Sequence, residues 1–401
     1  MNLQQAKDIY VASAIFICNL LVIFVVINLA VAGYDLSVGR LQLFQSASRS
    51  TNPVSERYGN ERLALVYPGK TQQQIQVLLA ETWSRPYVYE PFTQFREGLY
   101  RGQYVNVEHG FRRSANQAAW PPDPRRFNVF VFGGSTTFGY GVADSETVAS
   151  HLQDEIRART GLPVAIYNFG RGFYYSTQER VLFEQLVSSG QRPQLTIFID
   201  GLNEFYHRSD EPRFSSSLRV FLASDHSTDF WSSWSGAAEL PAIRAARRAA
   251  ARLACWLRDC KSIQREATEE AEEAAKLSTE DQVGAIAKTL NRYRTNRRLI
   301  EAAAAAFGIA AAFVWQPVPT YKYDQTSHLF AGSDYYGSLA GYRLFAAEMR
   351  DSPADDFIWC ADIQEGRHEP LYVDQVHYTP SFAKTLAICI ASQLRERGLL
   401  R

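Results

Sequence analysis

Three side chains in this sequence have the types and spacing that acyl-transfer chemistry at a serine requires. Ser135 closes the stretch "FNVFVFGGS" at 127–135, in which an apolar run ends at two glycines. A free serine hydroxyl is a weak nucleophile and needs a base within hydrogen-bond reach. Asp374 and His377 lie in "YVDQVHYTP", three positions apart, and this spacing lets the carboxylate orient an imidazole whose other nitrogen faces a nucleophile. The three residues are therefore a candidate nucleophile, base and orienting acid.

Two other stretches supply hydrogen-bond donors for the oxyanion that forms when a serine attacks a carbonyl. "NFGRGFYYSTQE" contains Gly172, which lets a backbone N–H face the same cleft, and "DGLNE" contains Asn203, whose amide can also donate. Taken alone, each stretch is equally compatible with an ordinary turn between a strand and a helix. The glycine-rich turn at Ser135 also suits a phosphate-binding loop. However, no Gly-Lys-Ser/Thr follows it, and its spacing is not G-x-G-x-x-G.

The elements that must position these residues alternate between apolar strands and amphipathic helices. We predict strands at 127–134, 163–170, 194–203, 310–318 and 355–363. We predict helices at 145–160, capped by Asp144 or Ser145, at 176–190, and from Thr379 and Pro380 onward. Nearly continuous apolar strands that alternate with helices indicate a parallel sheet covered on both faces. The predicted architecture is a three-layer α/β/α fold, in which the loops at the carboxyl ends of the strands converge on one site.

In order and type, these stretches resemble the sequence blocks of the SGNH (GDSL-like) hydrolase superfamily, which is named for Ser, Gly, Asn and His. The resemblance covers roughly 127–203 and 372–398. Gly-Gly-Ser135 stands where the family often has Gly-Asp-Ser, and "VDQVH" matches the D-x-x-H block. Glu204 stands where the family usually has Asp after the Asn. The family's glycine commonly occupies the position that is Phe173 in this chain, so Gly172, one position earlier, is the nearest match.

The resemblance implies a flavodoxin-like parallel sheet and serine ester chemistry that needs neither a metal nor an organic cofactor. In that chemistry His377 takes the proton of Ser135, and Asp374 aligns His377. The backbone N–H groups of Ser135 and Gly172 and the amide of Asn203 form the oxyanion hole. Water resolves the acyl-enzyme in a hydrolase, and a sugar hydroxyl resolves it in an O-acyltransferase.

The N-terminus contains an uncharged apolar segment at 11–34, which is long enough to span the roughly 30 Å hydrocarbon core of a membrane. We predict a short tail at 1–10, a transmembrane anchor at 11–34, and a linker and N-terminal extension at 35–126. The hydrolase domain follows at 127–401, with a helical insertion at about 204–280. A cleaved signal peptide is the alternative for the apolar segment, because "AVAG" resembles a cleavage site. We expect the short N-terminal end to lie inside and the catalytic domain to lie outside the cytoplasm, mainly because of the chemistry that the resemblance implies.

Charge and cysteine content exclude some classes of partner. Lys plus Arg and Asp plus Glu both total 42, which gives no basis for nucleic-acid binding. The five cysteines form neither a C-x-x-C pair nor a Cys/His cluster, so no metal site is predicted. Cys255 and Cys260 can bridge in an oxidising compartment or remain unlinked core thiols. The insertion is basic at 240–261 and acidic at 265–281, as expected for a lid apposed to anionic lipid or for a solvated helical insertion.

The expected substrates are acylated glycans or small esters of the cell envelope. Aromatic residues near the candidate site can stack on sugar rings or serve as packing residues; they are Tyr140, Tyr174, Tyr175, Trp315 and Tyr378. A lipid ester hydrolase is an alternative enzyme. A non-catalytic envelope scaffold or glycan-binding protein is the alternative of another class, although such a binder has no need to keep all of Ser135, Asn203, Asp374 and His377.

Overall fold

The computed structural model describes residues 3–37, 54, 58–207, 210–215, 279–330, 337–351 and 356–400. The predicted insertion, including Cys255 and Cys260, lies almost entirely outside the described residues. The chain divides into two compact units, Met1–Ser48 with Ser217–Ala275, and Arg49–Ser216 with Lys276–Arg401. The second unit contains all the candidate site residues, together with residues 49–126 of the predicted linker and N-terminal extension.

In the first unit, the described residues form one helix, α1 (Leu3–Ser37). Its segment Tyr10–Val31 is long and apolar enough to cross a membrane, and a signal sequence near the N-terminus meets the same criterion. The helix begins within the segment predicted as a short tail. The predicted apolar segment 11–34 is thus helical throughout.

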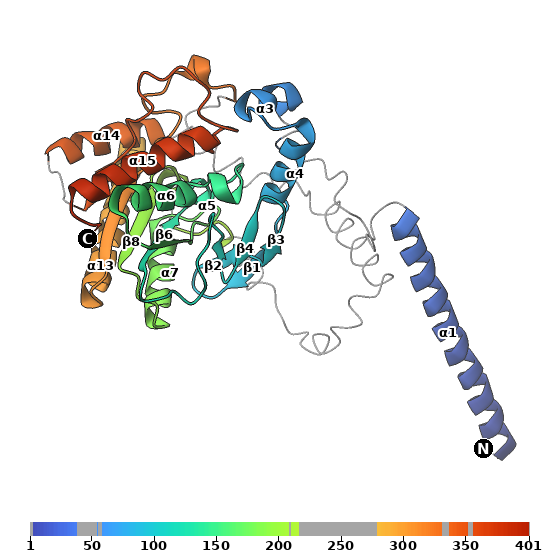
Figure 1. The fold of residues 1–401 in the computed structure, drawn as a ribbon. Helices are drawn as coiled ribbons and strands as arrows, with labels where there is room; N and C mark the ends of the chain where they lie inside the picture. Colours follow the sequence, from blue (N-terminus) through green and yellow to red (C-terminus); the bar gives the residue numbers. More distant parts are fainter. Residues whose placement is uncertain are drawn as a thin grey trace. The chain divides into compact units, whose positions relative to one another are not determined.

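The second unit is built on a sheet with the strand order β10–β9–β8–β6–β7–β5–β4–β3 (Figure 1). Five of these strands are the predicted ones, and neighbours among them pair in parallel. They are β6 (Phe127–Gly133), β7 (Val164–Asn168), β8 (Leu195–Asp200), β9 (Ala310–Trp315) and β10 (Phe357–Trp359). Numbered along the chain, their order in the sheet is 2-1-3-4-5, which is the flavodoxin-like order. The order reverses between β6 and β8, and such a switch point is where α/β sheets form their sites.

Three short strands from the N-terminal extension extend this sheet beyond β7. They are β3 (Tyr100–Arg101), β4 (Asn106–Glu108) and β5 (Phe111–Arg112), and they pair antiparallel. The sheet is therefore mixed, and part of the predicted linker and N-terminal extension belongs to it. A second, two-stranded sheet consists of β1 (Tyr87–Glu90) and β2 (Gln94–Glu97).

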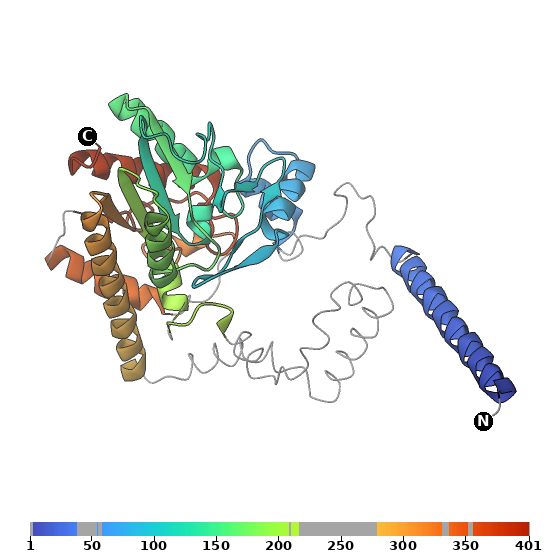
Figure 2. The same ribbon diagram turned by 90° about the horizontal axis from the view of Figure 1, so that it is seen from below.

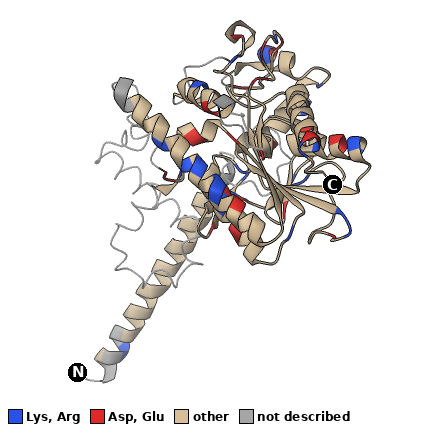
Figure 3. Ribbon diagram, turned by 90° about the vertical axis from the view of Figure 1, so that its left-hand side faces the viewer, with Lys and Arg blue, Asp and Glu red and all other residues tan. Residues whose placement is uncertain are grey.

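Helices cover both faces of the main sheet, as predicted (Figure 2). One face packs against α6 (Val148–Thr160) and α15 (Pro380–Glu396), whose apolar sides meet the β-branched residues of the central strands. The other face, which is rich in aromatic residues, packs against α7 (Ser176–Ser188), α13 (Thr279–Ala306) and α14 (Ser338–Asp351). In the view of Figure 3, Lys and Arg positions are interspersed with Asp and Glu positions along the described helices, which agrees with the zero net charge.

The N-caps of two helices show where the predictions were right and wrong. Thr379 caps α15 by accepting a hydrogen bond from Phe382 N, as predicted. The cap of α6 is Thr147, which accepts from Ser150 N, and neither Asp144 nor Ser145 has this role. Those two residues belong to a 3-10 turn, η1 (Asp144–Glu146). The Asp144 carboxylate instead accepts hydrogen bonds from Asn106 and Arg112 in the added strands.

The N-terminal extension packs against the catalytic half of the unit through a separate apolar core. Its helices are α3 (Asn60–Val66) and α4 (Gln72–Trp83). Buried residues of these helices, such as Leu63 and Leu79, join Phe138 and Val373 in one cluster. Phe138 follows the candidate nucleophile and Val373 precedes Asp374, so the extension is placed beside the candidate site.

A disulfide joins Cys360, directly after β10, to Cys389 in α15, with Cα atoms 6.2 Å apart. The bridge links one edge of the parallel sheet to a helix that covers it. These two cysteines are 29 positions apart and form no sequence motif. The remaining short helices are α5 (Ser135–Phe138), α8 (Leu202–Tyr206) and the 3-10 turn η3 (Gln325–Ser327).

Candidate active site

Two glycines let β6 turn sharply into α5, so that Ser135 stands at the carboxyl edge of the sheet. A Cβ atom on Gly133 would lie 2.8 Å from the Ile199 carbonyl oxygen, and closer still to the Thr137 side chain. A Cβ atom on Gly134 would meet the Nδ2 atom of Asn203. Any larger residue at either position would therefore displace its neighbours. The glycines allow the Ser135 turn to approach β8 and the Asn203 amide closely.

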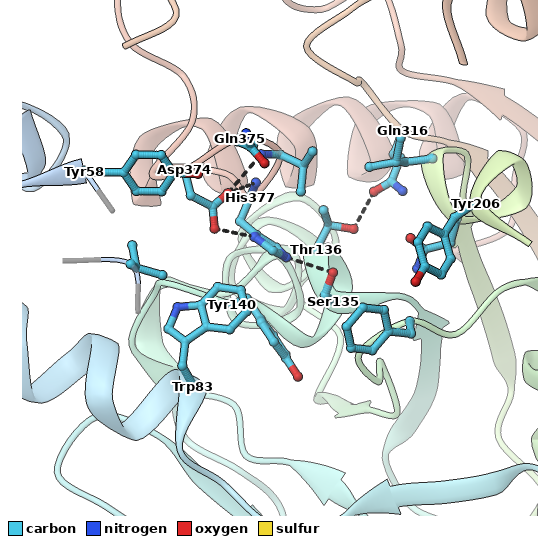
Figure 4. Close-up of a pocket in the computed structure, with 15 residues that line it drawn as sticks. Tyr58, Trp83, Ser135, Thr136, Tyr140, Tyr206, Gln316, Asp374, Gln375 and His377 are labelled. Atoms are coloured by element: carbon cyan, nitrogen blue, oxygen red, sulfur yellow. Dashed lines mark hydrogen bonds and ion pairs between the residues drawn. The ribbon is translucent and has the colours of Figure 1, made fainter. Parts of the chain in front are cut away.

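Ser135, His377 and Asp374 form one continuous hydrogen-bonded chain (Figure 4). The Ser135 hydroxyl lies 2.8 Å from His377 Nε2, although 242 positions separate the two residues. His377 Nδ1 lies 2.7 Å from Asp374 Oδ2. Because the carboxylate accepts the proton on Nδ1, Nε2 is left to accept the serine proton. The three residues thus have the geometry of a nucleophile, its base and the group that orients the base.

The Asp374 carboxylate is held in its ionised form by its neighbours. Its other oxygen, Oδ1, accepts hydrogen bonds from the backbone N–H groups of Val376 and His377, at 2.9 and 2.8 Å. Burial raises the pKa of Asp374, but the adjacent His377 and these hydrogen bonds outweigh burial, so the pKa lies below its ordinary value. A carboxylate that stays charged can stabilise the imidazolium that forms when His377 accepts a proton.

Two aromatic rings fix the position of the His377 imidazole. The Tyr140 ring stacks on it at a centroid distance of 5.3 Å, and the Trp83 ring meets it edge-on at 5.4 Å. The Tyr140 hydroxyl donates to Glu97 Oε1 at 3.0 Å, and Glu97 is paired with the buried Arg85. Trp83 comes from α4 in the N-terminal extension, and the sequence contains no motif that marks it as part of the site.

The three candidate oxyanion donors, Ser135, Gly172 and Asn203, differ in their hydrogen bonding. The Asn203 amide donates to the Tyr174 carbonyl at 2.6 Å, which orients Nδ2 and leaves its second hydrogen for another acceptor. Ser135 is the first residue of α5, so its backbone N–H has no acceptor within that helix. The Gly172 N–H contacts Glu97 Oε1 at 3.4 Å, and Gly172 does not line the cavity described below. Phe173 does line it, with a left-handed φ of 64°. The geometry therefore gives no support to the predicted role of Gly172.

Glu204, which stands where the SGNH superfamily usually has Asp, is buried and forms hydrogen bonds beside the turn that carries Asn203. It accepts hydrogen bonds from Ser176 N at 2.6 Å and from Arg292 of α13 at 3.3 Å. Burial raises its pKa, and these two partners oppose that rise. The longer side chain thus reaches the start of α7 and anchors the turn that carries Asn203.

A cavity of about 380 Å³ opens at Ser135 and His377 (Figure 4). Most of its described lining is apolar, aromatic or amide, including Tyr58, Trp83, Phe173, Tyr206 and Gln316. Of the aromatic residues predicted near the site, Tyr140 lines the cavity. The other four are buried packing residues: Tyr174, Tyr175, Trp315 and Tyr378. Among the described residues, no group of three or more His, Cys, Asp or Glu is placed to hold a metal ion.

No protein-family model and no curated protein matches this chain. Similar solved structures include a putative lipolytic protein of the G-D-S-L family from Desulfitobacterium hafniense, with 9% identity and a TM-score of 0.37 over 67% of this chain and 100% of that one. An acetylxylan esterase from Geobacillus stearothermophilus has 12% identity and a TM-score of 0.35 over 68% and 94%. The lipase Lip_vut3 from a goat rumen metagenome has 9% identity and a TM-score of 0.39 over 69% and 100%.

The 2-1-3-4-5 strand order agrees with the resemblance to the SGNH superfamily seen in the sequence. The contacts among Ser135, His377 and Asp374 at the carboxyl edge of the sheet agree with it as well.

Proposed function

We propose that this protein is a serine ester hydrolase of the SGNH type, with Ser135 as nucleophile, His377 as general base and Asp374 as the residue that orients the base. The observation that carries the proposal is the unbroken chain of contacts from Ser135 Oγ through His377 to Asp374, at 2.8 and 2.7 Å. Both distances are within the range for proton transfer along a hydrogen bond. The chain ends in a cavity large enough for a small ester.

The proposed reaction follows from this arrangement. His377 Nε2 takes the proton of Ser135 as Oγ attacks the ester carbonyl, and the Ser135 N–H and the Asn203 amide stabilise the oxyanion. His377 then returns the proton to the alcohol oxygen as the ester C–O bond breaks, which leaves an acyl group on Ser135. A water molecule, activated by His377, releases the acyl group as a carboxylic acid. If a sugar hydroxyl takes the place of water, the same steps transfer the acyl group.

The proposed substrates are neutral esters of short acyl groups on sugars or other small alcohols. Most of the described lining consists of apolar, aromatic and amide side chains, and neither Lys nor Arg is part of it. Aromatic faces and uncharged donors suit sugar rings, whereas a phosphate or carboxylate would call for a cation. Acetate release from an acetylated polysaccharide, compared with fatty-acid release from a lipid ester, distinguishes this substrate class from lipids. Transfer of labelled acetyl to an added glycan identifies the transferase reaction.

We also propose that α1 anchors the protein in a membrane and that the catalytic unit lies outside the cytoplasm. The disulfide between Cys360 and Cys389 supports this location, because such bridges persist in oxidising compartments. Protease added to intact spheroplasts should cleave the catalytic unit and leave a cytoplasmic marker protein intact. Protection of the catalytic unit under these conditions would contradict the location.

Turnover of p-nitrophenyl acetate by the full-length protein in detergent tests the activity. We expect Ser135→Ala to reduce kcat by a factor on the order of 10³ or more. Ser188→Ala is a matched control, because Ser188 is an exposed serine at the end of α7 whose hydroxyl donates to the Glu184 carbonyl in the same helix. Equal rates for the wild-type protein and Ser135→Ala would refute the proposal and would favour a binding protein without catalysis.

A further inference from the structure

Gln316 is the residue that directly follows β9, and its backbone is fixed on both sides. Its N–H donates to the Asp200 carbonyl at 2.9 Å, and its own carbonyl accepts from the Tyr342 hydroxyl at 2.9 Å. The residue is only 3% exposed, yet it lines the cavity at Ser135 (Figure 4). Its side chain therefore starts from a rigid point and ends at the candidate site.

The Gln316 side-chain oxygen contacts both segments that carry the proposed catalytic residues, one with Ser135 and the other with His377. Oε1 accepts from the Thr136 hydroxyl at 2.6 Å and lies 2.9 Å from the Tyr378 hydroxyl. Thr136 follows the nucleophile in sequence, and Tyr378 follows the base. The structure thus places the oxygen end of the amide against both of these hydroxyl groups.

The nitrogen end of the same amide then has its two hydrogens left for the cavity. Among the described residues, no hydrogen bond from Gln316 Nε2 is found, and Nε2 is not sealed from solvent. A rigid donor inside a mainly apolar cavity favours a bound molecule that offers an oxygen to it. The same donor disfavours a bound molecule that places an apolar group against Nε2, because Nε2 would then lose its hydrogen bond to water.

We infer that Gln316 determines specificity by donating a hydrogen bond from Nε2 to a hydroxyl or ether oxygen of the substrate, outside the ester group. This inference rests on the proposed ester hydrolase and narrows its substrates to esters of oxygen-rich alcohols such as sugars. Gln316 has two separate contacts in this view. Oε1 holds together the segments that carry Ser135 and His377, and Nε2 donates a hydrogen bond to the substrate.

The effect of the Oε1 contacts can be separated from that of the Nε2 contact by measuring the hydrolysis of two esters by two variants. The esters are an acetylated methyl glucoside and cyclohexylmethyl acetate, which place a sugar ring and an all-carbon ring beside the same acetyl group. Gln316→Met keeps the length of the side chain and removes both amide atoms. Thr136→Val removes the strongest contact to Oε1 and keeps Nε2.

We expect Gln316→Met to lower the preference in kcat/KM for the sugar ester over the carbocyclic ester by about five- to tenfold, the effect of one lost hydrogen bond to an uncharged group. Thr136→Val should lower kcat/KM for both esters by the same factor and leave the preference unchanged. If Gln316→Met also lowers both by the same factor, Gln316 only holds the active-site segments and the inference is wrong. An unchanged kcat/KM for both esters would refute it as well.

A binding measurement keeps this inference separable from the proposed function. If the wild-type protein hydrolyses neither of these esters and turns over p-nitrophenyl acetate no faster than Ser135→Ala does, the proposed function fails. Methyl glucoside and cyclohexylmethanol are then titrated into Ser135→Ala and into Ser135→Ala/Gln316→Met, with NMR line shifts as the readout. The inference predicts that Kd for methyl glucoside rises about five- to tenfold in the double variant, while Kd for cyclohexylmethanol changes by less than about twofold. Equal changes for the two alcohols would overturn it.

Discussion

The variants Gly134→Ala and Asn203→Ala should both weaken stabilisation of the oxyanion. A double-mutant cycle can test whether they act through the same contact. The Asn203 amide donates one hydrogen to the Tyr174 carbonyl at 2.6 Å, and in the proposed mechanism its other hydrogen binds the oxyanion. A Cβ atom on Gly134 would lie 2.3 Å from Asn203 Nδ2, and the next nearest heavy atom, the Tyr174 carbonyl oxygen, would be 3.2 Å away. Gly134→Ala must therefore push the amide aside while it leaves the rest of the turn almost undisturbed.

The magnitudes follow from the contact that each variant loses. Asn203→Ala removes one oxyanion donor, which costs a factor on the order of 10²–10³ in kcat, or about 3 kcal/mol of transition-state stabilisation. KM should change little, because the donor acts on charge that develops only in the transition state. The lost hydrogen bond to Tyr174 should cost about 1 kcal/mol of folding stability, so the variant stays folded. Gly134→Ala should lower kcat at least tenfold, since it displaces the same amide without removing it.

Steady-state kinetics with p-nitrophenyl acetate, together with thermal unfolding of each variant, measures the cycle. In the double variant the alanine at 203 leaves room for the alanine at 134. Its kcat should therefore lie within about threefold of that of Asn203→Ala alone. A double variant whose loss is the product of the two single losses would show that Gly134 acts through another contact. A single Asn203→Ala variant with more than a third of the wild-type kcat would remove Asn203 from the oxyanion hole.

Three further predictions concern the surroundings of the site. Trp83→Ala should lower kcat/KM about tenfold, because the imidazole of His377 loses a ring that holds its position. Leu65→Ala, which truncates an exposed side chain on α3, should leave kcat/KM unchanged. Equal kcat/KM values for the two variants would contradict a positioning role of Trp83. Burial lowers the pKa of His207 to about 4 although both ring nitrogens contact carbonyls, so stability should be lost as pH falls from about 6.5 to about 4, by up to about 3 kcal/mol. Urea unfolding at pH 7, 6 and 5 should show a smaller loss in His207→Gln, and an equal loss would be evidence against His207. Replacing Cys360 and Cys389 by alanine should lower the free energy of unfolding by about 3–4 kcal/mol for a loop of this length, and an unchanged urea midpoint would speak against the disulfide.

The five parallel strands were predictable because each lies in a nearly continuous apolar run, and the first three, β6, β7 and β8, lead into turns that contain glycine. The contact between Ser135 and His377 was predictable because parallel strands bring their carboxyl ends to one edge, whatever their separation in the chain. The antiparallel strands β3, β4 and β5 were not predictable as part of the sheet. Each has only two or three residues, which is too short for an alternating pattern to emerge.

Features that depend on distant packing could not be read from the sequence. Trp83 reaches His377 because α4 packs on Phe138 and Val373, and no local pattern encodes that contact. The cap of α6 is Thr147 because Asp144 is already bonded to Asn106 and Arg112. The pairing of Cys360 with Cys389 needs the distance between their Cα atoms, which spacing along the chain does not supply.

Labelling with an alkyl fluorophosphonate tests the central claim most directly, because such a reagent phosphonylates a serine only when a base activates it. Mass spectrometry of the digested protein should find the adduct on the peptide that carries Ser135. The labelling rate should fall at least 100-fold in His377→Gln, which removes the base next to the Ser135 hydroxyl. An unlabelled Ser135 in the wild-type protein, or labelling that is equally fast without His377, would contradict the account.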